Sequence, residues 1–104
     1  MEDCLFCKIA NHQKENLVWE NDAAVAFNDI HPKAPVHVLV VPKRHVANLD
    51  ELEDRDLAGQ MLMAVREVAH QQGLKGGYEV RLHNGLRAGQ EIDHLHLHVM
   101  GAKA

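Results

Sequence analysis

The chain has 104 residues, of which 46% are hydrophobic and 25% charged, and its formal net charge is −4. This composition is ordinary for one globular domain that builds its core without disulfides. The net negative charge argues against a nonspecific nucleic-acid binder. The sequence has no signal-peptide pattern and no apolar run near the ~20 residues that a membrane span needs. We therefore expect a cytoplasmic protein that binds neither nucleic acid nor membrane.

In chain order, the first predicted element after the N-terminal segment is a β-hairpin. Residues 17–20 (LVWE) and 23–28 (AAVAFN) resemble two short strands around an Asn21-Asp22 turn. Residues 36–41 (VHVLVV) are apolar and lie between two prolines, which predicts a buried strand. Apolar residues then recur at helical spacing within residues 54–72, and Gly73 follows them as a stop signal. We predict one long helix there.

The rest of the chain predicts two more strands. Residues 78–83 (YEVRLH) alternate between polar and apolar, residues 84–90 (NGLRAGQ) form a glycine-containing loop, and residues 92–100 form the last strand. Because strands far outnumber crossover helices, the sheet should be largely antiparallel. The prediction is a single α+β domain over residues 1–104, with about five strands, one long helix and a short N-terminal helix.

The most informative stretch is DHLHLHVM, residues 93–100, in which three histidines occupy alternate positions. On a strand, His94, His96 and His98 would share one face, and the apolar residues between them would face the core. A neutral imidazole nitrogen is a nucleophile near pH 7, so these rings could flank a phosphoryl group. Two alternatives stay open: a solvent-exposed strand face, and a zinc site, because His-x-His can present two nitrogens to one metal.

Three segments carry a family resemblance. HLHLHVM resembles the signature of the histidine triad (HIT) superfamily of nucleotide hydrolases and transferases. FNDIHPKAPVHVLVVPKRH (27–45) and HNGLRAGQEIDHLHLHV (83–99) resemble its two conserved blocks, and CLFCKI (4–9) is similar to the N-terminus of many small members. The branch resembles the small Hint-type phosphoramidases. The resemblance implies cleavage of a nucleoside 5′-phosphoramidate or related conjugate at the α-phosphorus, through a nucleotidyl-histidine intermediate.

The resemblance also assigns roles to individual residues. His96 would be the nucleophile, His98 would donate to the phosphate or the leaving group, and His37 would relay protons, although a core histidine is an equally good reading of His37. A purine nucleotide would be held by Asp29 at the ribose, by a base pocket and by a phosphate-side loop. The base-pocket residues are Leu5, Phe6, Ile9, Phe27, Ile30 and Leu39, and the loop residues are Asn84 and Gln90. Turn roles for Asp29 and Asn84, and core roles for the apolar residues, stay open.

Cys4 and Cys7 form a C-x-x-C pair. No strand precedes the pair, which argues against a redox motif, while two inert core cysteines remain an alternative. The resemblance implies a closed structural zinc site completed by His45 and His94, so that only the other two triad histidines would face substrate. No magnesium motif is visible, and we expect catalysis to need no cofactor.

The resemblance further implies a twofold homodimer, with the long helix and the strand of residues 78–83 at its interface. Two other functions stay open: hydrolysis of dinucleoside polyphosphates, and a zinc-stabilised nucleotide-binding module with little turnover.

Overall fold

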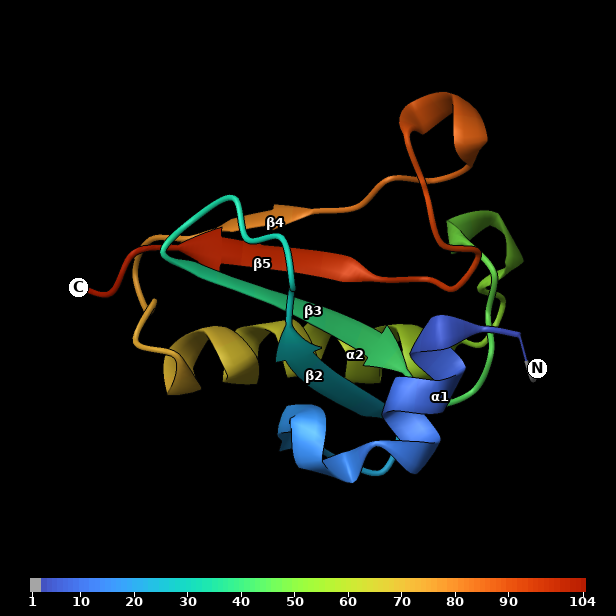
Figure 1. The fold of residues 1–104 in the computed structure, drawn as a ribbon, viewed down its shortest axis with the longest axis horizontal. Helices are drawn as coiled ribbons and strands as arrows, with labels where there is room; N and C mark the ends of the chain where they lie inside the picture. Colours follow the sequence, from blue (N-terminus) through green and yellow to red (C-terminus); the bar gives the residue numbers. More distant parts are fainter. Residues whose placement is uncertain (1–2) are drawn as a thin grey trace.

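The sheet of this protein has five strands, and the computed structural model describes residues 3–104 (Figure 1). The strands are β1 (Leu17–Glu20), β2 (Ala24–Asn28), β3 (Val36–Pro42), β4 (Glu79–Arg81) and β5 (Leu97–Gly101). Their order in the sheet is β1-β2-β3-β5-β4, and each neighbouring pair is antiparallel. The predicted α+β fold with an antiparallel sheet is confirmed.

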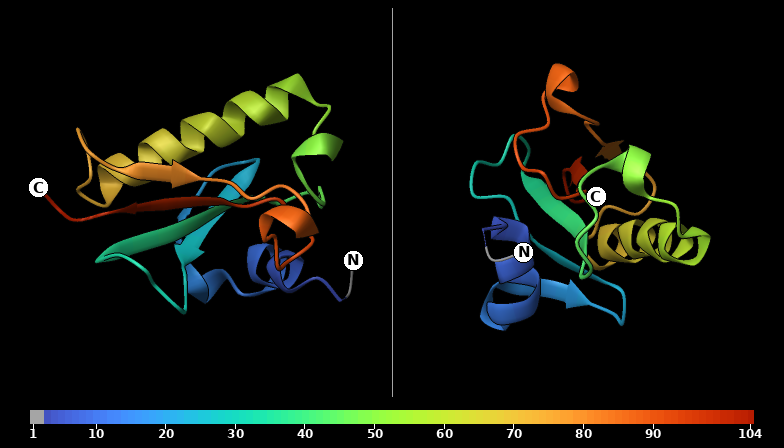
Figure 2. Two further views of the ribbon diagram at one scale, coloured as in Figure 1. Left: turned by 90° about the horizontal axis from the view of Figure 1, so that it is seen from above. Right: turned by 90° about the vertical axis from the view of Figure 1, so that its right-hand side faces the viewer.

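Two α-helices cover opposite faces of the sheet, α1 (Leu5–His12) on one and α2 (Arg55–Gln71) on the other (Figure 2). Helix α2 begins where the Asp54 carboxylate accepts a hydrogen bond from the backbone N–H of Leu57, as an N-cap does. The described residues also contain three short 3₁₀ turns, at Lys14–Asn16, Leu49–Glu51 and Leu86–Ala88. Among residues 3–104, no helix is both long and apolar enough to cross a membrane.

The central strand β3 separates two apolar clusters because its side chains alternate between the two faces. Val38 and Val40 join the larger cluster under α2, whereas Leu39 and Val41 join the smaller cluster beside α1. His37 alternates with Val38, so its ring lies on the α1 face of the sheet. His98 is paired with Leu39, which belongs to the cluster beside α1, so His98 lies on the same face as His37.

The last strand is shorter than predicted. β5 begins at Leu97, so His94 and His96 precede it, and the prediction of three histidines on one strand is wrong. The chain bends at residues 92–94, where the N–H of His94 donates to the carbonyl of Ile92, and the N–H of Leu95 then donates to the carbonyl of Val46. After this bend the His94 ring lies beside the N-terminal cysteines, whereas His98 lies within β5.

Candidate active site and metal centre

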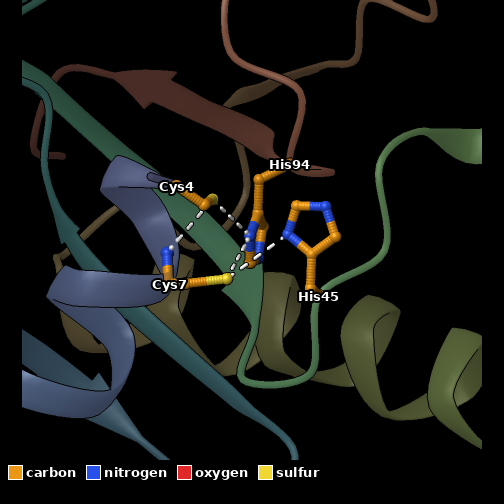
Figure 3. Close-up of side chains that lie close together, drawn as sticks. All are labelled: Cys4, Cys7, His45 and His94. Carbon is orange, nitrogen blue, oxygen red and sulfur yellow. Dashed lines mark hydrogen bonds between the residues drawn. The ribbon is translucent and has the colours of Figure 1, made fainter. Parts of the chain in front are cut away.

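Cys4, Cys7, His45 and His94 converge beside the first turn of α1 (Figure 3). Nδ1 of His94 lies 3.2 Å from Sγ of Cys4 and 3.4 Å from Sγ of Cys7. Nδ1 of His45 lies 3.3 Å from Sγ of Cys7. The four donor atoms all lie within 4.8 Å of one another. Two thiol sulfurs and two imidazole nitrogens so placed form a group that could hold a metal ion.

The outer contacts of His94 favour metal binding. Its Nε2 lies 2.9 Å from the carbonyl oxygen of Pro42, which can only accept a hydrogen bond, so Nε2 carries the ring proton. The lone pair of Nδ1 therefore faces the two sulfurs. A hydrogen bond from the other ring nitrogen to a carbonyl oxygen, here that of Pro42, is the usual way in which a metal-binding histidine is oriented. Burial of the ring is the main reason that the pKa of His94 falls to about 4, which keeps the imidazole in its neutral, ligating form. Burial, followed by the neighbouring Cys4, raises the pKa of the Cys7 thiol, and a bound cation would oppose that effect.

The ring of His96 is fixed in one tautomer by the backbone. Its Nδ1 lies 2.7 Å from the carbonyl oxygen of His94, so this nitrogen must carry the proton and donate it. The lone pair is consequently on Nε2. The Phe6 ring packs edge-on against the imidazole, with ring centroids 5.1 Å apart, and only 8% of His96 is exposed. His96 thus has a rigidly held ring with an unprotonated Nε2.

His37 and His98 form a hydrogen-bonded pair whose direction is also determined. The backbone N–H of Lys33 donates to Nδ1 of His37 at 3.0 Å, so the proton of a neutral His37 lies on Nε2. That N–H faces Nδ1 of His98 at 2.8 Å, which leaves the proton of His98 on its own Nε2. Burial is the main cause that lowers the pKa of both rings, that of His98 to about 4, and the neighbouring histidines lower the pKa of His98 further. At neutral pH, His98 is therefore a neutral N–H donor.

Asp29 adds a carboxylate to this pair, with Oδ2 3.3 Å from Nε2 of His37. Asp29, His37 and His98 also have their donor atoms within 4.8 Å of one another, a second arrangement that could suggest a metal ion. Binding a metal through Nε2 would require the His37 proton to move to Nδ1, where it would point at the N–H of Lys33. The tautomer therefore favours a hydrogen-bond chain over a metal site here.

The residues predicted to line the base pocket fall into two groups. Phe6, Phe27 and Leu39 are buried in the apolar cluster beside α1, against which Ile9 packs. Ile30 and Leu5 lie at the surface instead, with 83% and 47% of their surface exposed. The buried members have a core role in the structure, and contact with a base stays a prediction for all six.

The two carboxamides of the predicted phosphate loop hold the loop itself. Oδ1 of Asn84 accepts the N–H groups of Leu49 and Asp50 at 2.8 and 3.3 Å, and Nδ2 donates to the Asp50 carboxylate at 3.0 Å. Gln90 is buried and bridges three backbone groups, those of Ala47, Gly85 and Ile92. These contacts account for both side chains, while their predicted role toward phosphate stays a prediction.

One histidine of this cluster, His83, had no role in the sequence analysis. Its ring packs against that of His98 in a T-shaped arrangement, with centroids 5.6 Å apart. The strand pairing in the structure, which the sequence alone does not give, explains the position of this ring. Arg81 lies opposite His98 in the β4–β5 pair, and paired residues share a face, as do residues two apart on one strand. His83 follows the end of β4 by two residues, and its ring contact with His98 shows that it stays on this side of the sheet.

Comparisons with known proteins agree with this fold and site. The family model described as "Scavenger mRNA decapping enzyme C-term binding" matches residues 3–104. An uncharacterized HIT-like protein of Synechococcus elongatus is 41% identical over 106 residues, which cover 99% of this chain and 93% of the relative. The chain therefore belongs to the HIT family.

Two solved structures show the same fold. A HIT family hydrolase from Legionella pneumophila has a TM-score of 0.87 and 37% identity, over 98% of this chain and 95% of that one. A histidine triad nucleotide-binding protein from Candida albicans has a TM-score of 0.84 and 32% identity, over 97% of this chain and 76% of that one. The fold is thus one used by hydrolases and nucleotide-binding proteins of the HIT family.

Proposed function

We propose that this protein hydrolyses a nucleoside 5′-phosphoramidate, or a related purine nucleotide conjugate, at the α-phosphorus. The observation that carries the proposal is the hydrogen bond from Nδ1 of His96 to the carbonyl oxygen of His94, because it leaves Nε2 unprotonated and fixed in direction. Binding alone would not need such a nitrogen. The name of the Legionella relative, a hydrolase, and that of the Candida relative, a nucleotide-binding protein, support the same activity.

The reaction would proceed in two steps through a covalent intermediate. Nε2 of His96 attacks the phosphorus and the leaving group departs, which gives a nucleotidyl-histidine that water then hydrolyses. His98 donates its Nε2–H to the phosphoryl oxygens and stabilises the charge that develops on them. His37 fixes the orientation of His98 through their 2.8 Å hydrogen bond and connects it to Asp29. Donated N–H groups would take the place of the metal clamp common in phosphoryl transfer.

The nucleotide would lie along the α1 face of the sheet. Asp29 has a carboxylate that could accept the two ribose hydroxyls, since within residues 3–104 its Oδ1 accepts only the N–H of His31, at 2.8 Å. The exposed Ile30 directly follows Asp29, so a base stacked on it would cover apolar surface that is open in the free protein. The base would rest on the apolar cluster that Phe6, Ile9, Phe27 and Leu39 form. Asn84 and Gln90 would shape the phosphate-side loop from behind.

The metal of the cysteine–histidine group is proposed to be zinc with a structural role. Two thiolates and two imidazoles complete a tetrahedral zinc site and leave no open position for substrate. The ion would join α1, the segment after β3 and the segment before β5, which are far apart in sequence. Small domains gain much of their stability from such links.

The surface of α2 and β4 supports the proposed homodimer. Leu62 and Met63 on α2 are 66% and 51% exposed, and Val80 on β4 is 43% exposed. β4 ends the sheet, so its outer backbone groups are open to a second copy of the chain. We expect sedimentation equilibrium to give twice the mass of one chain, and a monomer mass at micromolar concentration would contradict this proposal. We also propose that the protein is cytoplasmic and binds neither nucleic acid nor membranes.

The activity is tested with a panel of adenosine and guanosine 5′-phosphoramidates and dinucleoside polyphosphates. We expect wild-type protein to release the nucleoside monophosphate from a phosphoramidate with a higher kcat/KM than from any polyphosphate. Turnover of the polyphosphates alone would assign the other enzymatic function. Nucleotide binding without turnover of either class would assign the binding module.

A further inference from the structure

His83 lies at the edge of the histidine cluster, two residues beyond the end of β4. Its ring contacts that of His98 with centroids 5.6 Å apart and is partly exposed. The backbone around it is anchored, because the carboxamide of the next residue, Asn84, binds Leu49 and Asp50. The ring is thus held beside His98 by its own main chain and still reaches solvent.

The proposed reaction needs a proton that His96 and His98 are poorly placed to supply. An amine leaves phosphorus readily only as a neutral molecule, so its nitrogen must be protonated as the bond breaks. The proton of His96 is on Nδ1, donated to the carbonyl of His94, while Nε2 makes the attack. His96 therefore has no proton to give.

His98 has a proton on Nε2. If His98 gave this proton away, its Nδ1 would have to take the Nε2 proton of His37 to keep the ring neutral. His37 could accept a compensating proton only on Nδ1, where the N–H of Lys33 already donates at 3.0 Å. The pair is thus arranged to remain neutral, and burial acts in the same direction on the pKa of His98. His98 is well suited to hydrogen-bond the phosphate and poorly suited to transfer a proton.

The ring of His83 carries no such restraint. Among the hydrogen bonds formed within residues 3–104, none involves a ring nitrogen of His83. The rings of His37, His96 and His98 are each held by a hydrogen bond to a backbone group or to a second ring. His83 can gain or lose a proton at either nitrogen without breaking a contact. We propose that His83 is a further catalytic residue, the general acid that protonates the leaving group and the general base that then activates water. This inference rests on the proposed function.

The proton and bond changes balance over the two steps. In the first, Nε2 of His96 forms a bond to phosphorus, the bond from phosphorus to the leaving nitrogen breaks with its electron pair on that nitrogen, and imidazolium His83 gives it a proton. In the second, a water oxygen bonds to phosphorus, the bond to His96 breaks with its electron pair on Nε2, and neutral His83 takes a proton from the water. The enzyme returns to its starting state.

Two leaving groups of different basicity test this role. One substrate is a purine nucleoside 5′-phosphoramidate of an alkylamine, which must be protonated to leave. The other is the p-nitrophenyl ester of the same nucleotide, whose phenolate leaves without a proton. Single-turnover rates of intermediate formation are compared for wild type, H83A and H83N. The matched control is H70A, which removes a partly buried histidine of α2 on the other face of the sheet.

We expect H83A and H83N to lose the ~10²–10⁴-fold contribution of a general acid with the alkylamine substrate and to stay within a few-fold of wild type with the ester. If His83 had a merely structural role, H83N would restore the rate because asparagine keeps a hydrogen-bonding side chain. In that case H83A would also slow both substrates equally. Either of those results, or an unchanged rate with the alkylamine, would overturn the role of His83. Failure of wild type itself to cleave both substrates would instead reject the proposed function.

Discussion

Replacing His96 with alanine is expected to abolish hydrolysis of every substrate that wild-type protein cleaves, because the substitution removes the attacking nitrogen. Nucleotide affinity should change little, since the base, ribose and phosphate contacts proposed above come from other residues. The fold should persist. The ring contributes one hydrogen bond, to the carbonyl of His94, which is worth ~0.5–1.5 kcal/mol, and two edge contacts, with Phe6 and with His98.

The measurements are the steady-state rate, the calorimetric Kd for the nucleoside monophosphate, and the melting temperature. H98A provides the comparison on the adjacent ring. We expect it to lose ~10²–10³-fold in rate, the cost of removing one hydrogen-bond donor to the developing charge, while retaining detectable turnover. A larger loss in H98A than in H96A would reverse the two roles. Full activity of H96A would reject the mechanism.

Removing the two cysteines is expected to have the largest effect on stability. Purified wild-type protein should contain about one zinc ion per chain, and the double variant C4S/C7S should contain none. Serine is close to cysteine in size, so the substitution leaves little cavity and chiefly removes the metal ligands. Each 1 kcal/mol lost from the free energy of unfolding, at the midpoint of thermal unfolding, lowers the melting temperature of a domain of this size by about 4–8 °C. Loss of a structural ion should therefore lower the melting temperature measurably.

The control for this experiment is wild-type protein treated with a strong chelator, which should melt like the double variant if the cysteines act through the metal. Activity measured well below the lower melting temperature should be largely retained, because a closed site does not touch the substrate. If wild-type protein purified without chelator contains no metal and C4S/C7S melts at the same temperature as that protein, both cysteines are ordinary core residues.

The parts of the fold that the sequence predicted well depend on local periodicity. β2, β3 and α2 have apolar patterns bounded by turn or stop residues, and each appears within a few residues of its predicted limits. The prediction of the last strand was wrong at its start, because the alternating pattern extends beyond the residues that form the strand. The alternation of histidine and apolar residues continues back to His94, but the chain bends there to bring this ring to Cys4 and Cys7. The contact of His94 with Cys4 joins residues 90 apart in sequence, so it leaves no local signal for the bend.

The composition of the site was easier to predict than its chemistry. The resemblance named the four residues of the metal group and the three histidines to which we assign catalytic roles, and the structure brings the metal group together. The proton positions depend instead on two backbone groups, the carbonyl of His94 and the N–H of Lys33. The orientation of a main-chain group in space follows from the tertiary fold, and for the same reason His83 drew no attention in the sequence.

Direct detection of the covalent intermediate tests the central claim most directly. Protein mixed with a phosphoramidate substrate is quenched within one turnover at alkaline pH, where phosphorus–nitrogen bonds survive, then digested and fragmented in a mass spectrometer. We expect the mass of one nucleotidyl group on the peptide that contains the triad, with fragment ions that place it on His96. A nucleotidyl group on His98, or rapid turnover with no adduct on any residue, would contradict nucleophilic attack by His96.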